Sequence, residues 1–168
     1  MILQKCSLWK VAEVFFREPT RVHYIKEISK KINLAHTSVK KHVRELIGEG
    51  LVEQTEGDIY TGYRAKRDSP HFIFAKKISN QILLQESGLL DVLKENYPEA
   101  IIIFGSYDKG EDLETSDIDI YADIKRYKTD LEKFESHLKR KIQIIFKGEA
   151  SKSLMGSINQ GTLLYGDR

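Results

Sequence analysis

Two stretches decide the fold of the second half of the chain: AIIIFGS at residues 100–106 and SDIDIY at residues 116–121. The first is a run of apolar and β-branched residues that predicts a buried strand ending at Gly105. In the second, side chains alternate between the faces of a predicted strand. Asp117 and Asp119 therefore lie on one face, and the intervening isoleucines lie on the other.

This pairing of aspartates predicts a site for a divalent cation. Two carboxylates about 6–7 Å apart along a strand repel each other, and a cation between them removes the conflict. We therefore expect Asp117 and Asp119 to be the catalytic residues and to hold Mg²⁺ or Mn²⁺, which keep waters and substrate phosphates as further ligands. At Gly105 the backbone can approach a phosphate closely, and Ser106 adds a hydroxyl donor. These two residues are the predicted nucleotide-binding pair.

The spacing of these motifs resembles a known signature. Phe104-Gly105-Ser106, ten intervening residues at 107–116, and then Asp117-Ile118-Asp119 are similar to the pattern of the DNA polymerase β-like nucleotidyltransferase superfamily. The string is closest to the minimal nucleotidyltransferases, which often occur in prokaryotic toxin–antitoxin pairs, and the resemblance covers about residues 98–166. It implies Mg²⁺-dependent transfer of a nucleoside monophosphate from an NTP to a hydroxyl acceptor, with release of pyrophosphate.

One position departs from that family. Its third carboxylate lies on a later strand, and the matching residue here is Gln143, within KIQII at residues 141–145. A glutamine oxygen can coordinate a metal, but it carries no charge and cannot accept a proton as a base. We therefore expect weakened or absent transfer, whereas nucleotide and metal binding can persist.

The first part of the chain predicts a different module. Apolar residues at helical spacing predict helices over residues 7–17, 23–32 and 37–48, with Asn33 as a C-cap. Two short strands follow at 51–55 and 59–65, joined by a turn at Gly57-Asp58. Three helices and a hairpin resemble winged helix-turn-helix DNA-binding domains over about residues 5–67, and the third helix then enters the major groove.

Polar side chains on that third helix and on the hairpin are the predicted contacts to double-stranded DNA. Lysine and arginine can neutralise phosphates or read guanine, and serine and threonine can bind either phosphate or base edges. The alternative is an ordinary solvated helix face. The predicted contacts are His36, Thr37, Ser38, Lys40, Lys41, Arg44, Arg64 and Lys66.

Composition supports two modules. Residues 1–67 hold 13 Lys and Arg against 8 Asp and Glu, whereas residues 68–168 hold 14 against 17. We expect a winged helix-turn-helix domain at 1–67, connecting helices at 68–97 and a nucleotidyltransferase-like domain at 98–168, which makes the chain α+β. The helix expected at 71–85 offers an apolar face for packing or for a homodimer. No apolar run is long enough to span a membrane. The single cysteine, Cys6, is expected in the core. One cysteine cannot form an internal disulfide, so we expect a cytoplasmic location.

Two functions remain open from the sequence. The first is an enzyme that transfers nucleotides to a protein hydroxyl or a small molecule and also binds DNA. The second is a winged-helix transcription regulator, or an antitoxin that binds a toxin partner, whose second module binds nucleotide or partner without catalysis. Gln143 and the basic first module favour the second reading.

Overall fold

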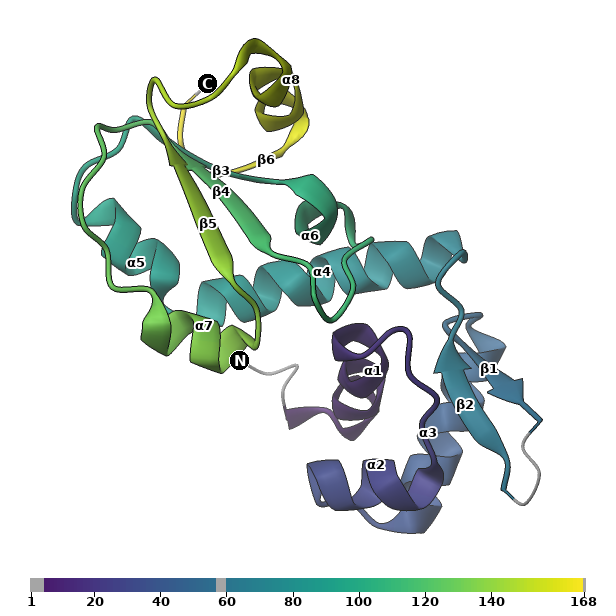
Figure 1. The fold of residues 1–168 in the computed structure, drawn as a ribbon. Coiled ribbons are helices and arrows are strands. Elements are labelled where there is room, and N and C mark those ends of the chain that lie inside the picture. Colours follow the sequence, from purple (N-terminus) through teal and green to yellow (C-terminus); the bar gives the residue numbers. More distant parts are fainter. Residues whose placement is uncertain (1–4, 57–59, 168) are drawn as a thin grey trace. The chain divides into compact units, whose positions relative to one another are not determined.

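The computed structural model describes residues 5–56 and 60–167 (Figure 1). The chain divides into two compact units, whose boundary falls between Ser79 and Asn80. That boundary lies inside one long helix, α4 (Pro70–Glu86). In the described part of the chain, no helix combines the length and apolarity needed to cross a membrane.

The first unit is a winged helix-turn-helix. It contains α1 (Ser7–Arg17), α2 (Ile25–Ile32), α3 (His36–Gly48) and an antiparallel hairpin of β1 (Val52–Thr55) and β2 (Gly62–Ala65). The apolar stripes of the three helices meet in one core with the start of α4. Fully buried members of that core include Val11, Phe15, Ile28 and Val39.

Local backbone chemistry explains where α2 begins and ends. The helix starts at Ile25 and not at residue 23, because His23 pairs with Tyr63 through backbone hydrogen bonds of 2.8 and 2.9 Å. The pair adds a bridge beside β2. Asn33 ends the helix in the left-handed conformation, with φ of 51°, as predicted. The predicted turn at Gly57-Asp58 lies outside the described residues.

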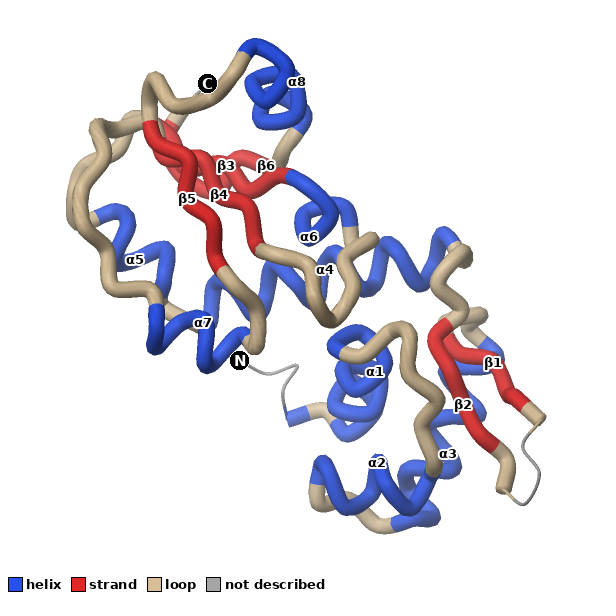
Figure 2. Tube along the Cα trace, viewed as in Figure 1, coloured by secondary structure: helices blue, strands red, loops and turns tan. Residues whose placement is uncertain are grey.

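The second unit is built on a four-stranded mixed sheet. Its strands are β3 (Ala100–Phe104), β4 (Ile118–Ala122), β5 (Ile142–Phe146) and β6 (Thr162–Gly166), in the order β5-β4-β3-β6. β3 pairs antiparallel with β4 and β6, and β4 pairs parallel with β5. The strands are coloured red in Figure 2. The remaining helices are α5 (Leu89–Lys94), α6 (Gly105–Lys109), α7 (Glu132–Leu138) and α8 (Lys152–Gln160).

Helices cover both faces of this sheet. On one face, Ile101, Ile103 and Ile118 pack against the C-terminal half of α4 and against α5 and α7. On the other face, Ile102 and Phe104 pack against α8. Figure 1 shows α8 on the opposite side of the sheet from α5 and α7. β3 is buried along its whole length, as its apolar sequence predicts.

Three expectations from the sequence differ from the structure. The apolar spacing of Leu131, Phe134 and Leu138 predicts a helix over residues 127–139, but the structure forms helix only over α7. In its first turn, Glu132 N–H donates a hydrogen bond of 3.1 Å to Asp130 Oδ1. β6 was not predicted, because the segment is short and follows directly on α8. Cys6 is exposed and does not belong to the core.

Candidate functional site

The turn from β3 into α6 brings the backbone against a carboxylate. Gly105 has a φ of +76°, which L side chains rarely adopt. A Cβ at this position would collide with Oδ2 of Asp119, whose Cγ would lie 3.3 Å away. The glycine is thus required twice, by the backbone conformation and by the approach of Asp119. Ser106 follows in the first turn of α6, half-buried.

Asp119 lies near the start of the central strand β4, between β3 and β5. Asp119 pairs with Phe104 on β3 and with Gln143 on β5 in the sheet register. Burial raises the pKa of the Asp119 carboxyl above its ordinary value, and the negative charge of Asp117 raises it further. Asp117 is exposed and lies just before β4. The two predicted aspartates therefore interact electrostatically, and a cation between them would relieve the repulsion.

The register also shows which side chain lies beside Asp119 on the neighbouring strand. Because β4 and β5 are parallel, Gln143 lies directly beside Asp119 and on the same face of the sheet. The nearby carboxylates are engaged elsewhere: Glu135 accepts hydrogen bonds from Lys141 and from the backbone of Ile142, and Glu149 binds Arg126. The site thus presents two carboxylates and one neutral amide.

This donor set suits a cation that completes its shell with other oxygens. Within residues 5–56 and 60–167, no group of three or more His, Cys, Asp or Glu side chains is placed to hold a metal. Mg²⁺ commonly binds through one or two carboxylates and takes waters and substrate phosphates as its remaining ligands. Asp117, Asp119 and the amide oxygen of Gln143 fit that mode, in which the nucleotide itself supplies part of the shell.

A buried polar network holds the loop that joins α6 to β4. Asp112 is 1% exposed and accepts a hydrogen bond of 2.7 Å from Asn80 Nδ2. Asn80 Nδ2 also donates to the carbonyl oxygen of Tyr107 at 2.8 Å. Arg140, just before β5, lies 3.6 Å from the Asp112 carboxylate. The network links α4, the loop and the start of β5, and it thereby positions Asp117 relative to Gln143.

Sequence reasoning did not find this network. Asp112 falls in an acidic loop, where a carboxylate is usually solvated, and its partners are distant in the sequence. The neighbouring hollow, of about 450 Å³, is lined by Asp117, the loop residues before it, α7 and residues 139–141. Its lining mixes both charges: Lys139, Arg140 and Lys141 lie beside Glu114, Glu132 and Glu135. Lys141 is paired with Glu135 at 2.8 Å.

The predicted DNA-contact residues lie on the exposed side of the first unit. Four of them, Thr37, Lys40, Lys41 and Arg44, line one depression of about 430 Å³ on α3. His36 is exposed at the start of the helix, whereas Ser38 is half-buried. On the hairpin, Arg64 and Lys66 are both exposed, and the guanidinium of Arg64 is paired with Glu53 at 2.6 Å. Glu45 also lines the depression, 3.9 Å from Lys41. The helix thus gathers three cations and one carboxylate, and on the hairpin Arg64 is paired with a carboxylate.

Comparisons with known proteins bear on the two units separately. Residues 88–168 match the family model described as "Polymerase beta, Nucleotidyltransferase". The matched residues lie within the second unit, which is thus similar in sequence to nucleotidyltransferases of the polymerase β type. A search of curated proteins found no match.

Among solved structures, a mutant of ZitR from Lactococcus lactis aligns with 51% of this chain and with 60% of its own length. The TM-score is 0.41 and the sequence identity is 11%. A likeness this remote carries no argument on function.

Proposed function

We propose that the second unit binds a nucleoside triphosphate together with a divalent cation. Asp117 and Asp119 would hold Mg²⁺ or Mn²⁺, and Gly105 and Ser106 would contact the phosphates. The observation that carries the proposal is the approach of the Gly105 backbone to the Asp119 carboxylate, which places the turn from β3 into α6 beside the proposed cation ligand. The family match over residues 88–168 supports the same reading.

The reaction proposed for this site is transfer of a nucleoside monophosphate. An acceptor hydroxyl oxygen forms a bond to the α-phosphorus, the bond to the bridging oxygen breaks, pyrophosphate leaves, and the hydroxyl proton passes to a base. A bound divalent cation would neutralise charge on the phosphates during this exchange. The protein's part is to orient the phosphates at Gly105 and Ser106 and to hold the two aspartates side by side for the cation. A hydroxyl of a protein or of a small molecule would serve as acceptor.

A second function is favoured by Gln143. The amide lies beside Asp119 where a third carboxylate would accept the acceptor's proton, and an amide cannot do so. The alternative proposal is therefore a DNA-binding regulator or an antitoxin whose second unit binds nucleotide, or a toxin partner, without transfer. Where the second unit binds nucleotide, both proposals require the same site and differ in turnover; where it binds a toxin partner, no nucleotide binding is expected.

Titration calorimetry tests the site. Each NTP is titrated with and without Mg²⁺ into the wild type, Asp119→Asn and Asp123→Asn. Asp123 is the matched control, because it lies beyond the end of β4 and pairs with Lys147 at 3.0 Å. We expect Mg²⁺-dependent binding in the wild type and the control and its loss in Asp119→Asn. Equal binding by all three proteins would refute the site.

We further propose that the first unit binds double-stranded DNA through α3 and the hairpin. The support is the cluster of Thr37, Lys40, Lys41 and Arg44 on one exposed depression. Removing one phosphate contact weakens binding at every sequence and lowers the salt slope by about 1. We expect that result for Lys41→Ala in a duplex-binding assay over a salt series. Lys152→Ala, on the exposed side of α8, is the control, and an equal effect of both variants would contradict the assignment.

A further inference from the structure

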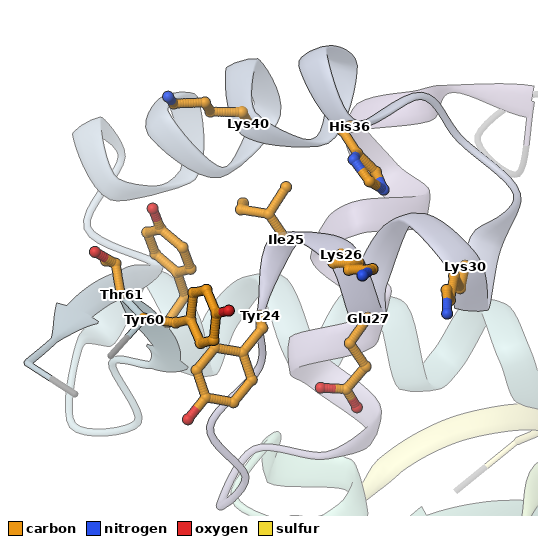
Figure 3. Close-up of a pocket in the computed structure, with 10 residues that line it drawn as sticks. Tyr24, Ile25, Lys26, Glu27, Lys30, His36, Lys40, Tyr60 and Thr61 are labelled. Carbon is orange, nitrogen blue, oxygen red and sulfur yellow. The ribbon is translucent and has the colours of Figure 1, made fainter. Parts of the chain in front are cut away.

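A groove of about 860 Å³ lies in the first unit, between α2, α3 and the hairpin (Figure 3). Its volume is in the range of about 300–1,000 Å³ that is typical of small-molecule sites. Tyr24, at the start of α2, and Tyr60, before β2, line one flank. Figure 3 shows their rings near each other, with Lys26 and Lys30 extending from α2 further along the groove.

The aromatic rings of the groove are unusually open to solvent. The side chain of Tyr60 is 73% exposed, and that of Tyr24 is 41% exposed. An exposed ring at a concave surface offers its face to a planar partner. Every nucleobase has such a face, and stacking on tyrosine is how proteins commonly hold unpaired bases.

The charges of the groove complement a phosphate backbone. Lys26, Lys30 and Lys40 line it, and none of them forms an ion pair with another described residue. Among the described residues that line the groove, the carboxylate is that of Glu27, which is paired with Arg21 at 2.6 Å. The groove is thus an apolar and aromatic hollow with an excess of positive charge at its walls, which is the chemistry that recognises a nucleotide strand.

A DNA duplex cannot stack its bases on the two tyrosines of this groove. Paired bases offer only their edges in the major groove, because their faces are hidden in the stack. A duplex placed on α3 can contact Lys40 and His36, but it leaves the exposed ring faces of Tyr24 and Tyr60 without a planar partner. We propose that the groove binds an unpaired segment of nucleic acid, with bases on Tyr24 and Tyr60 and phosphates on Lys26, Lys30 and Lys40. This proposal concerns the first unit and does not depend on nucleotide transfer.

The shared lining makes the two binding modes compete. Lys40 and His36 line the groove and also belong to the predicted duplex contacts. A strand in the groove would occupy cations that the duplex needs. We therefore expect an unlabelled strand to displace a labelled duplex.

The test is fluorescence anisotropy on the full chain with three labelled probes of one sequence: single-stranded DNA, single-stranded RNA and the DNA duplex. The test variant is Tyr24→Leu with Tyr60→Leu, which keeps the apolar bulk and removes the stacking faces. The control is Tyr97→Leu, whose side chain is 87% exposed in the second unit. We expect the double variant to lose about 10-fold or more in affinity for at least one strand and less than about 2-fold for the duplex. The strand that binds more tightly shows whether the groove prefers DNA or RNA.

A second variant keeps the proposal testable if the tyrosine variant fails to fold. Lys26→Ala with Lys30→Ala should reduce the salt slope of strand binding by about 1.4, which is about 0.7 for each lost phosphate contact. Three results would overturn the proposal: no strand binding by the wild type, an equal loss of strand and duplex binding in the tyrosine variant, or displacement of the strand by free mononucleotides at similar concentrations.

Discussion

The approach of the Asp119 carboxylate to Gly105 gives the sharpest mutational test of the proposed nucleotide site, Gly105→Ala. An L residue in the left-handed region costs about 1–2 kcal/mol. The added Cβ would also push the Asp119 carboxylate from its place, and moving a side chain off its rotamer adds about 0.5–1.5 kcal/mol. The variant should therefore lose about 1.5–3.5 kcal/mol in the free energy of unfolding of the second unit. Metal-dependent nucleotide binding should fall more than about tenfold, which is about 1.4 kcal/mol, because Asp119 is displaced.

Gly88→Ala is a matched control, since Gly88 has a φ of +77° and an added Cβ would meet nothing within 4 Å. Gly88→Ala should lower the free energy of unfolding by only the backbone cost of about 1–2 kcal/mol, and nucleotide binding should be unchanged. Trp9, the single tryptophan, lies in the first unit, so tryptophan fluorescence does not follow the unfolding of the second unit. Hydrogen exchange of the backbone amides of β3 and β4 measures the free energy of unfolding of the second unit. In an Asp119→Ala background, Gly105→Ala should lower the free energy of unfolding only as much as the control Gly88→Ala does. Equal nucleotide binding by Gly105→Ala and Gly88→Ala would refute the reasoning.

Three further predictions follow from other contacts. Gln143→Asp should raise Mg²⁺-dependent transfer measured by pyrophosphate release, because it supplies a proton acceptor beside Asp119; unchanged release would show that the third position does not limit turnover. Asp112→Asn should destabilise the second unit by about 3 kcal/mol in denaturant unfolding, since it leaves the buried charge of Arg140 without its carboxylate, and a loss below about 0.5 kcal/mol would contradict this role. Burial lowers the pKa of His23 in the folded protein below its ordinary value of about 6.5. As the pH falls through that value, the unfolded chain takes up a proton that the folded chain does not, so the folded state loses stability. Thermal melts of the first unit should therefore show a falling stability from pH 7.5 to pH 5.5. His23→Gln should abolish that pH dependence and the exposed His137→Gln should not; the reverse would rule out His23 as the cause.

Much of the architecture could be predicted because it depends on local patterns. The run of apolar residues at 100–104 predicted β3, and the alternation from Asp117 to Tyr121 predicted β4. The helical spacing of apolar residues in the first unit predicted three helices and a core. Each of these signals is contained within a few residues, so no knowledge of distant contacts was required.

The rest depends on pairings between distant segments. Gln143 could be matched to the third carboxylate only by resemblance, and its place beside Asp119 follows from the parallel pairing of β4 and β5. The contact of Asp112 with Asn80 joins residues 32 positions apart. Tyr24 and Tyr60 likewise meet in one groove only after α2 and the hairpin have folded together. Nothing in the local sequence marks these residues as partners.

The most direct measurement of the central claim is the anomalous scattering of Mn²⁺ in crystals of the wild type grown with a non-hydrolysable NTP. We expect one peak between the carboxylates of Asp117 and Asp119, with phosphate density against Gly105 and Ser106. The peak should be absent from crystals of Asp119→Asn grown in the same way. A Mn²⁺ peak elsewhere, or nucleotide density remote from the turn between β3 and α6, would contradict the claim.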